Sequence, residues 1–296
     1  MLNNVLVIGA VNIDINTQTV KPYTMHDSNI INSTISIGGV GGNIAFNLAR
    51  LGVHVSFLTI LGNDSFAHTI TKTFKELQIQ YPESLILDTK SNLYISVLDH
   101  QGELFLGLND MKSISYLTPT IIQSKHDYIS QFNTIVIDNN LEAETIHHIC
   151  KTYHDKFLII DAVSCEKAPK LLPVLDYVNI VKMNKLEYDE LFDGKAEAQN
   201  TLQNQITKGL QVLLTDHDQD IFVYTAHKTY QTTPIPCSNI VSTSGAGDGL
   251  LSGYIYGIVS GKTIEESLEI GKRIAYVTSQ VPTSTSKEVK SNEFSN

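Results

Sequence analysis

Short apolar runs alternate with helix-periodic segments along most of this 296-residue chain, and the alternation restricts its fold more than any other feature. The runs are rich in Val, Ile and Leu, as strands buried on both faces are. The expected strands are 2–9, 53–61, 134–138, 157–161, 177–181, 211–215 and 221–224. The expected helices are 41–51, 143–153, 185–192, 196–206, 246–260 and 264–281. The pattern predicts a doubly wound α/β fold, in which helices cover both faces of a mainly parallel sheet.

Two segments, 28–37 and 91–108, are strand-like and interrupt the alternation. In the second, residues 93–99 and 103–108 flank a His-Gln-Gly turn, which is typical of a hairpin. We expect these pieces to form a small antiparallel sheet that projects from the main domain as a lid over a ligand crevice. Because such a sheet has free edges and an apolar face, we also expect a homodimer that pairs through the lid.

The composition limits the organisation and the partners of the chain. We expect one domain over 1–282, followed by a polar tail, 283–296, that is rich in Ser and Lys and disordered. The 21 basic and 31 acidic residues give a net charge of −10, which argues against nucleic acid or an anionic membrane as a partner. No secretory signal pattern or membrane-length apolar run occurs, so a cytoplasmic protein is expected.

Residues 242–248 read Ser-Thr-Ser-Gly-Ala-Gly-Asp and stand directly before an apolar helical segment. Backbone N–H groups at a helix start are unpaired, and the helix dipole adds positive charge, so such a start binds anions. Gly245 and Gly247 allow the backbone to approach a phosphate, and Asp248 could accept the proton of an attacking hydroxyl. The segment therefore indicates phosphoryl transfer to an alcohol. The alternative is an ordinary glycine-rich helix start with Asp248 as an acid in its first turn.

A second group of residues suits the acceptor. Asn12 and Asp14 follow the first strand, and a carboxylate can accept hydrogen bonds from two neighbouring hydroxyls, as a ribose presents them. Asn43 begins the next helix and adds one amide donor and one acceptor. The glycines before it, which would let the ligand approach the backbone, are Gly38, Gly39, Gly41 and Gly42. The alternatives are a turn residue for Asp14 and a helix cap for Asn43.

Three motifs then occur in the order seen in the PfkB carbohydrate kinases, the ribokinase-like family. They are the Gly-Gly pair at 38–39, Asn-Lys-Leu-Glu at 184–187 and Gly-Ala-Gly-Asp at 245–248. The chain resembles this family from about residue 3 to about residue 280. The resemblance implies ATP as donor, Mg²⁺, and Asp248 as the catalytic base. It also implies that Gly245, Ala246 and Gly247 form the anion hole for the transferring phosphoryl group.

The resemblance further implies that Asn184 and Glu187 organise Mg²⁺ and phosphate, largely through water, since Mg²⁺ retains several water ligands. The same two residues have the spacing of a capping box, and the two roles are compatible. Lys182 could reach a nucleotide phosphate, although a solvated lysine at a strand end is the alternative. The residues implied for the adenine pocket are Thr215, Asp216, Ala275 and Thr278.

Within the family, the chain resembles the pseudouridine kinases through the strings at 9–14, 38–41, 43–50, 109–111, 117–119 and 138–141. This resemblance implies phosphorylation of the 5′-hydroxyl of pseudouridine. The alternatives are a kinase of ribose, adenosine or another nucleoside, and a non-catalytic nucleoside-binding protein.

The remaining candidates lie at strand ends. Asn109 and Asp110 follow the hairpin and could read the base or cap the next helix, and Asp138 could contact substrate or phosphate. The chain also departs from the family pattern. Ser242 stands where many members carry an Asp linked to monovalent-cation activation, so the resemblance leaves a K⁺ requirement open. Residues 215–218 lack the usual glycines, and Gly42 replaces an Arg that is frequent in pseudouridine kinases.

Overall fold

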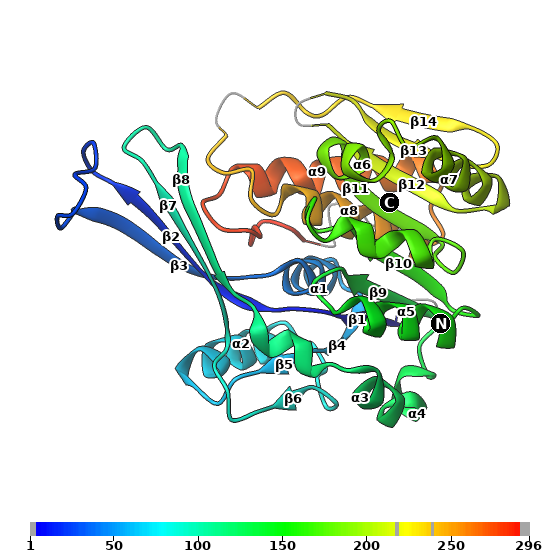
Figure 1. Ribbon diagram of the computed structural model, residues 1–296, viewed down its shortest axis with the longest axis horizontal. Coiled ribbons are helices and arrows are strands. Elements are labelled where there is room, and N and C mark those ends of the chain that lie inside the picture. Colours follow the sequence, from blue (N-terminus) through cyan, green and yellow to red (C-terminus); the bar gives the residue numbers. More distant parts are fainter. Residues whose placement is uncertain (1–3, 217–218, 238–239, 291–296) are drawn as a thin grey trace.

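The computed structural model describes residues 4–216, 219–237 and 240–290 (Figure 1). An eight-stranded sheet forms its centre, in the order β14-β13-β12-β11-β10-β9-β1-β4. In this order, the neighbouring strands from β12 to β4 are parallel to one another, whereas β13 and β14 form antiparallel pairs. Their bounds are β1 Asn4–Ile8, β4 His54–Leu58, β9 Thr134–Asp138, β10 Phe157–Asp161, β11 Ile180–Asn184, β12 Gln211–Thr215, β13 Ile221–Tyr224 and β14 Thr229–Thr232. The predicted mainly parallel α/β fold is confirmed.

Helices cover both faces of this sheet. One face carries α1 Val40–Arg50, α2 Ser65–Glu76, α8 Ala246–Val259 and α9 Ile264–Ser279. The other carries α3 Pro119–Ser124, α4 His126–Ile129, α5 Ala143–Thr152, α6 Lys185–Phe192 and α7 Ala196–Lys208, with the 3₁₀ helices η1 Lys112–Tyr116 and η2 Ala168–Val174. None of the helices in the described ranges is long and apolar enough to cross a membrane.

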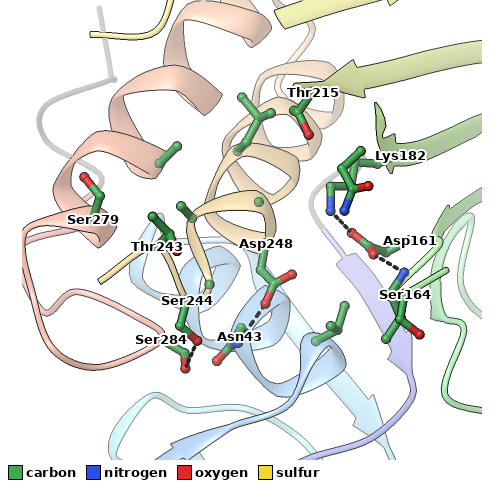
Figure 2. A pocket seen from close by; sticks show the side chains of 18 of the residues that line it. Asn43, Asp161, Ser164, Lys182, Thr215, Thr243, Ser244, Asp248, Ser279 and Ser284 are labelled. Carbon is green, nitrogen blue, oxygen red and sulfur yellow. Dashed lines mark hydrogen bonds and ion pairs between the residues drawn. The ribbon is translucent and has the colours of Figure 1, made fainter. Parts of the chain in front are cut away.

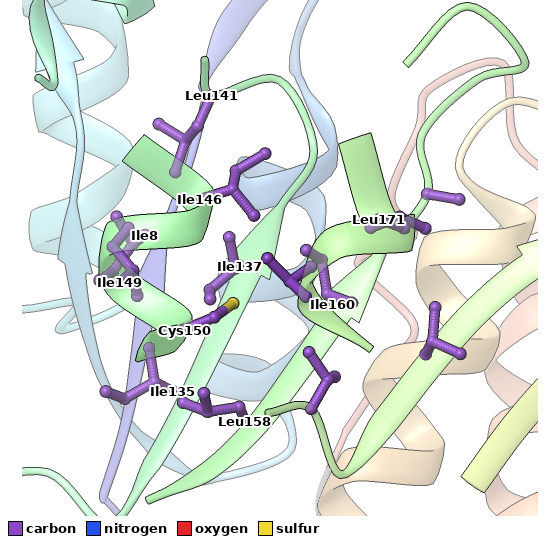
Figure 3. Close-up of a cluster of buried hydrophobic side chains, with 14 of the residues drawn as sticks. Ile8, Ile135, Ile137, Leu141, Ile146, Ile149, Cys150, Leu158, Ile160 and Leu171 are labelled. Carbon is purple, nitrogen blue, oxygen red and sulfur yellow. The ribbon is translucent and has the colours of Figure 1, made fainter. Parts of the chain in front are cut away.

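Strand alternation divides the apolar core between the two faces. In β9, Ile135 and Ile137 face one helical layer, whereas Val136 between them faces the other. Figure 3 shows the first of these clusters, where Ile146 and Ile149 of α5 pack over the strands. Burial on both faces explains why the strands read as continuous apolar runs.

Several predicted boundaries are wrong. The predicted strand 177–181 is displaced, because β11 begins at Ile180 and continues through the polar residues of the site. The predicted strand 53–61 is interrupted at Thr59, and its last two residues form β5 (Ile60–Leu61), which pairs with β6 (Leu85–Ile86). The helix α2 and the strand β14 were not predicted.

A second, four-stranded sheet extends away from the main one (Figure 1). We call it the projecting sheet. Its order is β3-β2-β7-β8, with bounds β2 Asn12–Thr19, β3 Ile31–Gly38, β7 Asn92–Leu98 and β8 Leu104–Asp110. The β7–β8 hairpin agrees with the prediction. The prediction missed β2, which runs parallel to β7, so the sheet is mixed rather than antiparallel.

The residues after α9 pack against the domain. Ser284, Ser286 and Val289 are buried, with exposed fractions of 2%, 1% and 2%. Val289 lies against Leu51 and α9. The prediction of a disordered tail is therefore wrong for residues 284–289, because small hydroxyl side chains and one valine find buried contacts there. Residues 291–296 of that predicted tail lie outside the described residues.

Candidate active site

A cavity of about 1300 Å³ opens at the carboxyl ends of the parallel strands. Asp161, Asn184 and Thr215 are the last residues of β10, β11 and β12, and all three line it. The projecting sheet contributes Tyr94 and Asn109 on one side. Figure 2 shows the part of the cavity around the start of α8. Ligands of open α/β sheets bind at this edge, so the cavity is the candidate active site.

Asp248 lies in the first turn of α8 and faces the cavity, with 7% of its surface exposed. Its Oδ2 accepts a 2.7 Å hydrogen bond from Asn43 Nδ2 of α1 (Figure 2). Burial, and secondarily the negative charge of Asp161, raises the pKa of Asp248 to about 7. A carboxylate with this pKa is suited to accept a proton near neutral pH. Asn43 Oδ1 is buried and has no hydrogen-bond partner among the described residues, which leaves it available to a ligand hydroxyl.

The loop before Asp248 has the form of an anion site. Gly245 is the N-cap of α8 and has a φ of 75°, a left-handed conformation that favours glycine. The N–H of Ala246 points to the Thr243 carbonyl at 3.3 Å, so this predicted member of the anion hole is partly engaged in a turn. Gly247 faces the ammonium of Lys182, since a methyl group on Gly247 would lie 3.0 Å from Nζ. The helix start and this ammonium together provide positive charge for a phosphate.

Lys182 is buried and paired with Asp161, whose Oδ2 lies 3.0 Å from its Nζ (Figure 2). Burial lowers the pKa of Lys182, but the carboxylates of Asp161, Glu187 and Asp248 together raise it by a larger amount. The net shift of this pKa is upward, so the amine is charged. Lys182 is thus a buried, paired side chain that lines the cavity rather than a solvated lysine at a strand end. Sequence reasoning missed Asp161, whose only local signal was its place at the end of an apolar strand.

The turn after Asp161 is strained. Val163 lines the cavity with a φ of 70°, which is unusual for a β-branched residue. Asp161 Oδ1 accepts the Val163 N–H at 2.8 Å and holds this turn in place. Asp161 therefore fixes both the ammonium of Lys182 and the backbone at the cavity wall.

Asn184 and Glu187 form the capping box that their spacing allows. Asn184 Oδ1 accepts the Glu187 N–H, and Glu187 Oε2 accepts the Asn184 N–H, each at 2.8 Å. Both residues also line the cavity, where burial raises the pKa of Glu187. Among the described residues, no three His, Cys, Asp or Glu side chains form a group that could hold a metal ion by themselves. The donor set therefore fits a metal held mainly through water and ligand phosphates, not one enclosed by protein.

Asn12 and Asp14 of β2, which were predicted to bind the acceptor, both line the cavity. Asn12 Nδ2 donates to Asp14 Oδ1, and Ser284 Oγ donates to Asp14 Oδ2 at 2.9 Å. A methyl group on Gly38 would lie 2.0 Å from Asp14 Oδ2, and Gly39 has a φ of 89°. Gly38 is thus needed for the close approach of β3 to the carboxylate, and Gly39 for the left-handed turn from β3 into α1.

Gly41, Gly42 and Asp138 were also predicted to bind the substrate, but they lie outside the cavity and make structural contacts. The Asp138 carboxylate is fully buried and accepts the backbone N–H groups of Ala10 at 2.7 Å and Gly41 at 2.8 Å. It does not line the cavity, so the expectation that Asp138 contacts substrate is wrong. Gly42 packs against Val11 and does not line the cavity either.

Only some of the residues predicted to bind the nucleotide line the cavity. Thr215, Asp216 and Ala275 line the cavity, whereas Thr278 is fully buried outside it, where a side chain on Gly249 would touch its hydroxyl. In the projecting sheet Asn109 lines the cavity, but the exposed Asp110 does not. The 217–218 part of the nucleotide loop lies outside the described residues. The cavity residues that sequence reasoning did not select include Ser164, Lys167, Lys272, Tyr276, Ser279 and Ser284.

Comparison with known proteins agrees with this arrangement. The model of the pfkB family of carbohydrate kinases matches residues 2–290. The chain is 26% identical over 275 residues to a pseudouridine kinase of Escherichia coli, covering 90% of this chain and 88% of that protein. A solved carbohydrate kinase from Agrobacterium tumefaciens superposes with a TM-score of 0.84 at 26% identity, covering 99% of this chain and 96% of the other.

The fold also matches ribokinase from Arabidopsis thaliana complexed with ribose and ATP. The TM-score is 0.79 at 18% identity, and the superposition covers 99% of both chains. The family match includes the glycine motif of α1, the 184–187 segment and the start of α8, which meet at one cavity. This chain belongs to the pfkB family of carbohydrate kinases.

Proposed function

We propose that this kinase transfers the γ-phosphoryl group of ATP to the 5′-hydroxyl of pseudouridine, forming pseudouridine 5′-phosphate. Family membership supports an ATP-dependent phosphotransferase. The similarity to the pseudouridine kinase of Escherichia coli over most of both chains supports the acceptor.

The observation that carries the proposal is the position of Asp248. Its buried carboxylate lies at the start of α8 and is held by Asn43, in the same cavity as Asp14. Asp14 and Asn43 bind the ribose hydroxyls, which directs the 5′-hydroxyl to Asp248. Asp248 takes the proton of that hydroxyl as its oxygen bonds to the γ-phosphorus and the bond to the ADP oxygen breaks.

The start of α8 and Lys182 bind the transferring phosphoryl group. Negative charge on its oxygens meets the N–H groups of Gly245 and Gly247 and the ammonium that faces Gly247. Asn184 and Glu187 would hold Mg²⁺, largely through water, and the metal would neutralise charge on the phosphates. Thr215, Asp216 and Ala275 form the wall against the adenine.

The projecting sheet acts as a lid that excludes water from this reaction.

The same sheet also pairs two copies of the chain. Ile35 of β3 and Leu104 of β8 are 62% and 59% exposed, and Leu106 and Leu108 continue this apolar surface. A second copy that covers these residues would form a homodimer. Light scattering at micromolar concentration should give the dimer mass, and Leu106→Lys should shift it to the monomer. A wild-type protein of monomer mass would contradict the pairing.

A substrate panel tests the acceptor. Turnover of pseudouridine, uridine, adenosine and ribose would be compared with ATP and Mg²⁺, with and without K⁺. We expect the highest kcat/KM for pseudouridine, with the phosphate on the 5′-oxygen. A preference for ribose or adenosine would overturn the acceptor assignment but leave the kinase assignment intact. Binding of the nucleosides without any phosphorylation would overturn both.

A further inference from the structure

The segment that follows α9 reaches the cavity and contributes Ser284 to its wall. Ser284 is 2% exposed, and the segment is anchored at Val289, which packs against Leu51, Ile270 and Ile274. A polar side chain held this firmly next to a ligand cavity has a fixed direction.

The Ser284 hydroxyl lies between the two halves of the site. Its Oγ donates to Asp14 Oδ2 at 2.9 Å, and Ser244 Oγ lies 3.2 Å from it (Figure 2). A hydroxyl has only one proton, and that of Ser284 goes to the carboxylate, so Ser244 is the donor to Ser284. We call residues 242–247, which lead into Asp248, the phosphate loop. The hydrogen bonds thus run from Ser244 in this loop through Ser284 to Asp14.

The backbone of Ser284 also contacts the phosphate loop. A methyl group on Gly245 would lie 1.9 Å from the Ser284 carbonyl oxygen, so the loop and the C-terminal segment are in van der Waals contact. This contact keeps Ser284 in register with the start of α8. Its distance from Asp14 is therefore set by the same packing that sets the anion site.

The Asp14 carboxylate is oriented by one donor at each oxygen. Asn12 binds Oδ1 and Ser284 binds Oδ2, and each oxygen retains capacity for one more hydrogen bond from a ligand. Burial raises the pKa of Asp14 and outweighs the hydrogen bonds from Ser284 and Asn12, which lower it; both bonds favour the ionised form, so losing that of Ser284 would raise this pKa further. Without Ser284 the carboxylate would keep a donor on one side only and could rotate away from the ligand.

We propose that Ser284 is a positioning residue for the acceptor: its hydroxyl holds the Asp14 carboxylate in the orientation that receives two sugar hydroxyls. The inference rests on the proposed role of Asp14 as the ligand of those hydroxyls. It adds a function to the C-terminal segment, which carries none of the family motifs.

The first test is a comparison of Ser284→Ala with Ser286→Ala. Ser286 is equally buried in the same segment, but within the described part of the chain its hydroxyl accepts only the local Glu288 N–H, so it is a matched control. A hydrogen bond to a charged group corresponds to about tenfold or more in affinity. We expect Ser284→Ala to raise KM for pseudouridine about tenfold, with little change in kcat or in KM for ATP. Ser286→Ala should leave all three unchanged, and an equal effect of both would overturn the proposal.

The second test separates positioning from a general structural role. If Ser284 acts through Asp14, Ser284→Ala should have no further effect on the acceptor KM once Asp14→Asn is present. If the increases in acceptor KM caused by the two substitutions multiply in the double variant, Ser284 acts through a group other than Asp14. Should Ser284→Ala not fold, judged by thermal melting, Ser284→Cys keeps a side chain of similar shape with a much weaker donor, and the same cycle is run with it.

The outcomes distinguish this inference from the proposed function. If Asp14→Asn raises the acceptor KM and Ser284→Ala does not, only the role of Ser284 is wrong. If Asp14→Asn leaves the acceptor KM unchanged, the proposed acceptor site is wrong and the role of Ser284 is overturned with it.

Discussion

The Asn43 side-chain amide donates a 2.7 Å hydrogen bond to the Asp248 carboxylate, although the two residues are 205 positions apart in the chain. The bond joins the start of α1 to the start of α8 at the boundary between the proposed acceptor and phosphate halves of the cavity. It fixes the orientation of a buried carboxylate whose pKa is raised to about 7. A rigid base at this boundary is what transfer of a phosphoryl group to a bound hydroxyl requires.

Asp248→Asn removes the base and nearly preserves the shape of the side chain. We expect kcat to fall by about 10²- to 10⁴-fold, the range that general base catalysis contributes. Pseudouridine binding, measured by calorimetry, should stay close to that of the wild type, because Asp14 and Asn43, the proposed sugar ligands, are unchanged. Turnover that survives the substitution would show that another group accepts the proton.

The pH dependence of kcat/KM reports the same base. Asp248 accepts a proton only when it is ionised, and its pKa of about 7 predicts activity that falls about tenfold per pH unit below that value. The hydrogen bond from Asn43 lowers this pKa, so Asn43→Ala should move the acid limb to higher pH. The readout is the pH at which kcat/KM begins to fall, since the maximum value of kcat/KM also depends on ribose binding. A limb that stays in place or moves to lower pH would argue against Asp248 as its origin.

Lys182 and Asp161 form a buried pair, so their stability effects should be coupled. Lys182→Met leaves the Asp161 carboxylate buried without its cation, and we expect a loss of about 3–5 kcal/mol in the free energy of unfolding. Adding Asp161→Asn should restore most of that loss in urea titrations but not kcat, because the ammonium at the phosphate site is still missing. Full activity of the stable double variant would show that Lys182 serves stability alone.

Asp138 should affect stability and not substrate binding. Asp138→Ala leaves buried backbone N–H groups of Ala10 and Gly41 without an acceptor, and we expect at least about 2 kcal/mol of destabilisation. Asp155→Ala is the control, because that carboxylate is 64% exposed. A stable Asp138→Ala protein with a raised acceptor KM would restore Asp138 as a substrate ligand.

The sequence predicts best those features that depend on neighbouring residues. The observed bounds of β9, β10, β12 and β13 equal the predicted ones, because a strand buried on both faces is a continuous apolar run. The strand β2 was missed, since Asn12 and Asp14 give it polar positions that serve the cavity.

The site divides in the same way. The glycine motifs and Asp248 were found because each lies in one short string beside a helix start. The Lys182–Asp161 pair and the Asp14–Ser284 hydrogen bond join distant segments, and neither has a local pattern. Asp138 was misread because a strand-end carboxylate looks the same in sequence whether it faces a ligand or backbone N–H groups.

Gly245→Ala tests the contact between the phosphate loop and the C-terminal segment, and the chain offers a matched control. Gly245 and Gly261 both have a φ of 75°, so an alanine at either costs about 1–2 kcal/mol of backbone strain. At Gly261 no described atom lies within 4 Å of the added methyl group, whereas at Gly245 the Ser284 carbonyl oxygen would be 1.9 Å away. We expect Gly261→Ala to lower the melting temperature modestly and keep full activity. Gly245→Ala should lower it further and also reduce kcat and raise the acceptor KM, because moving Ser284 displaces both the anion site and Asp14. Equal behaviour of the two variants would mean that the loop tolerates this shift, and that the close packing of Gly245 on Ser284 has no role in catalysis.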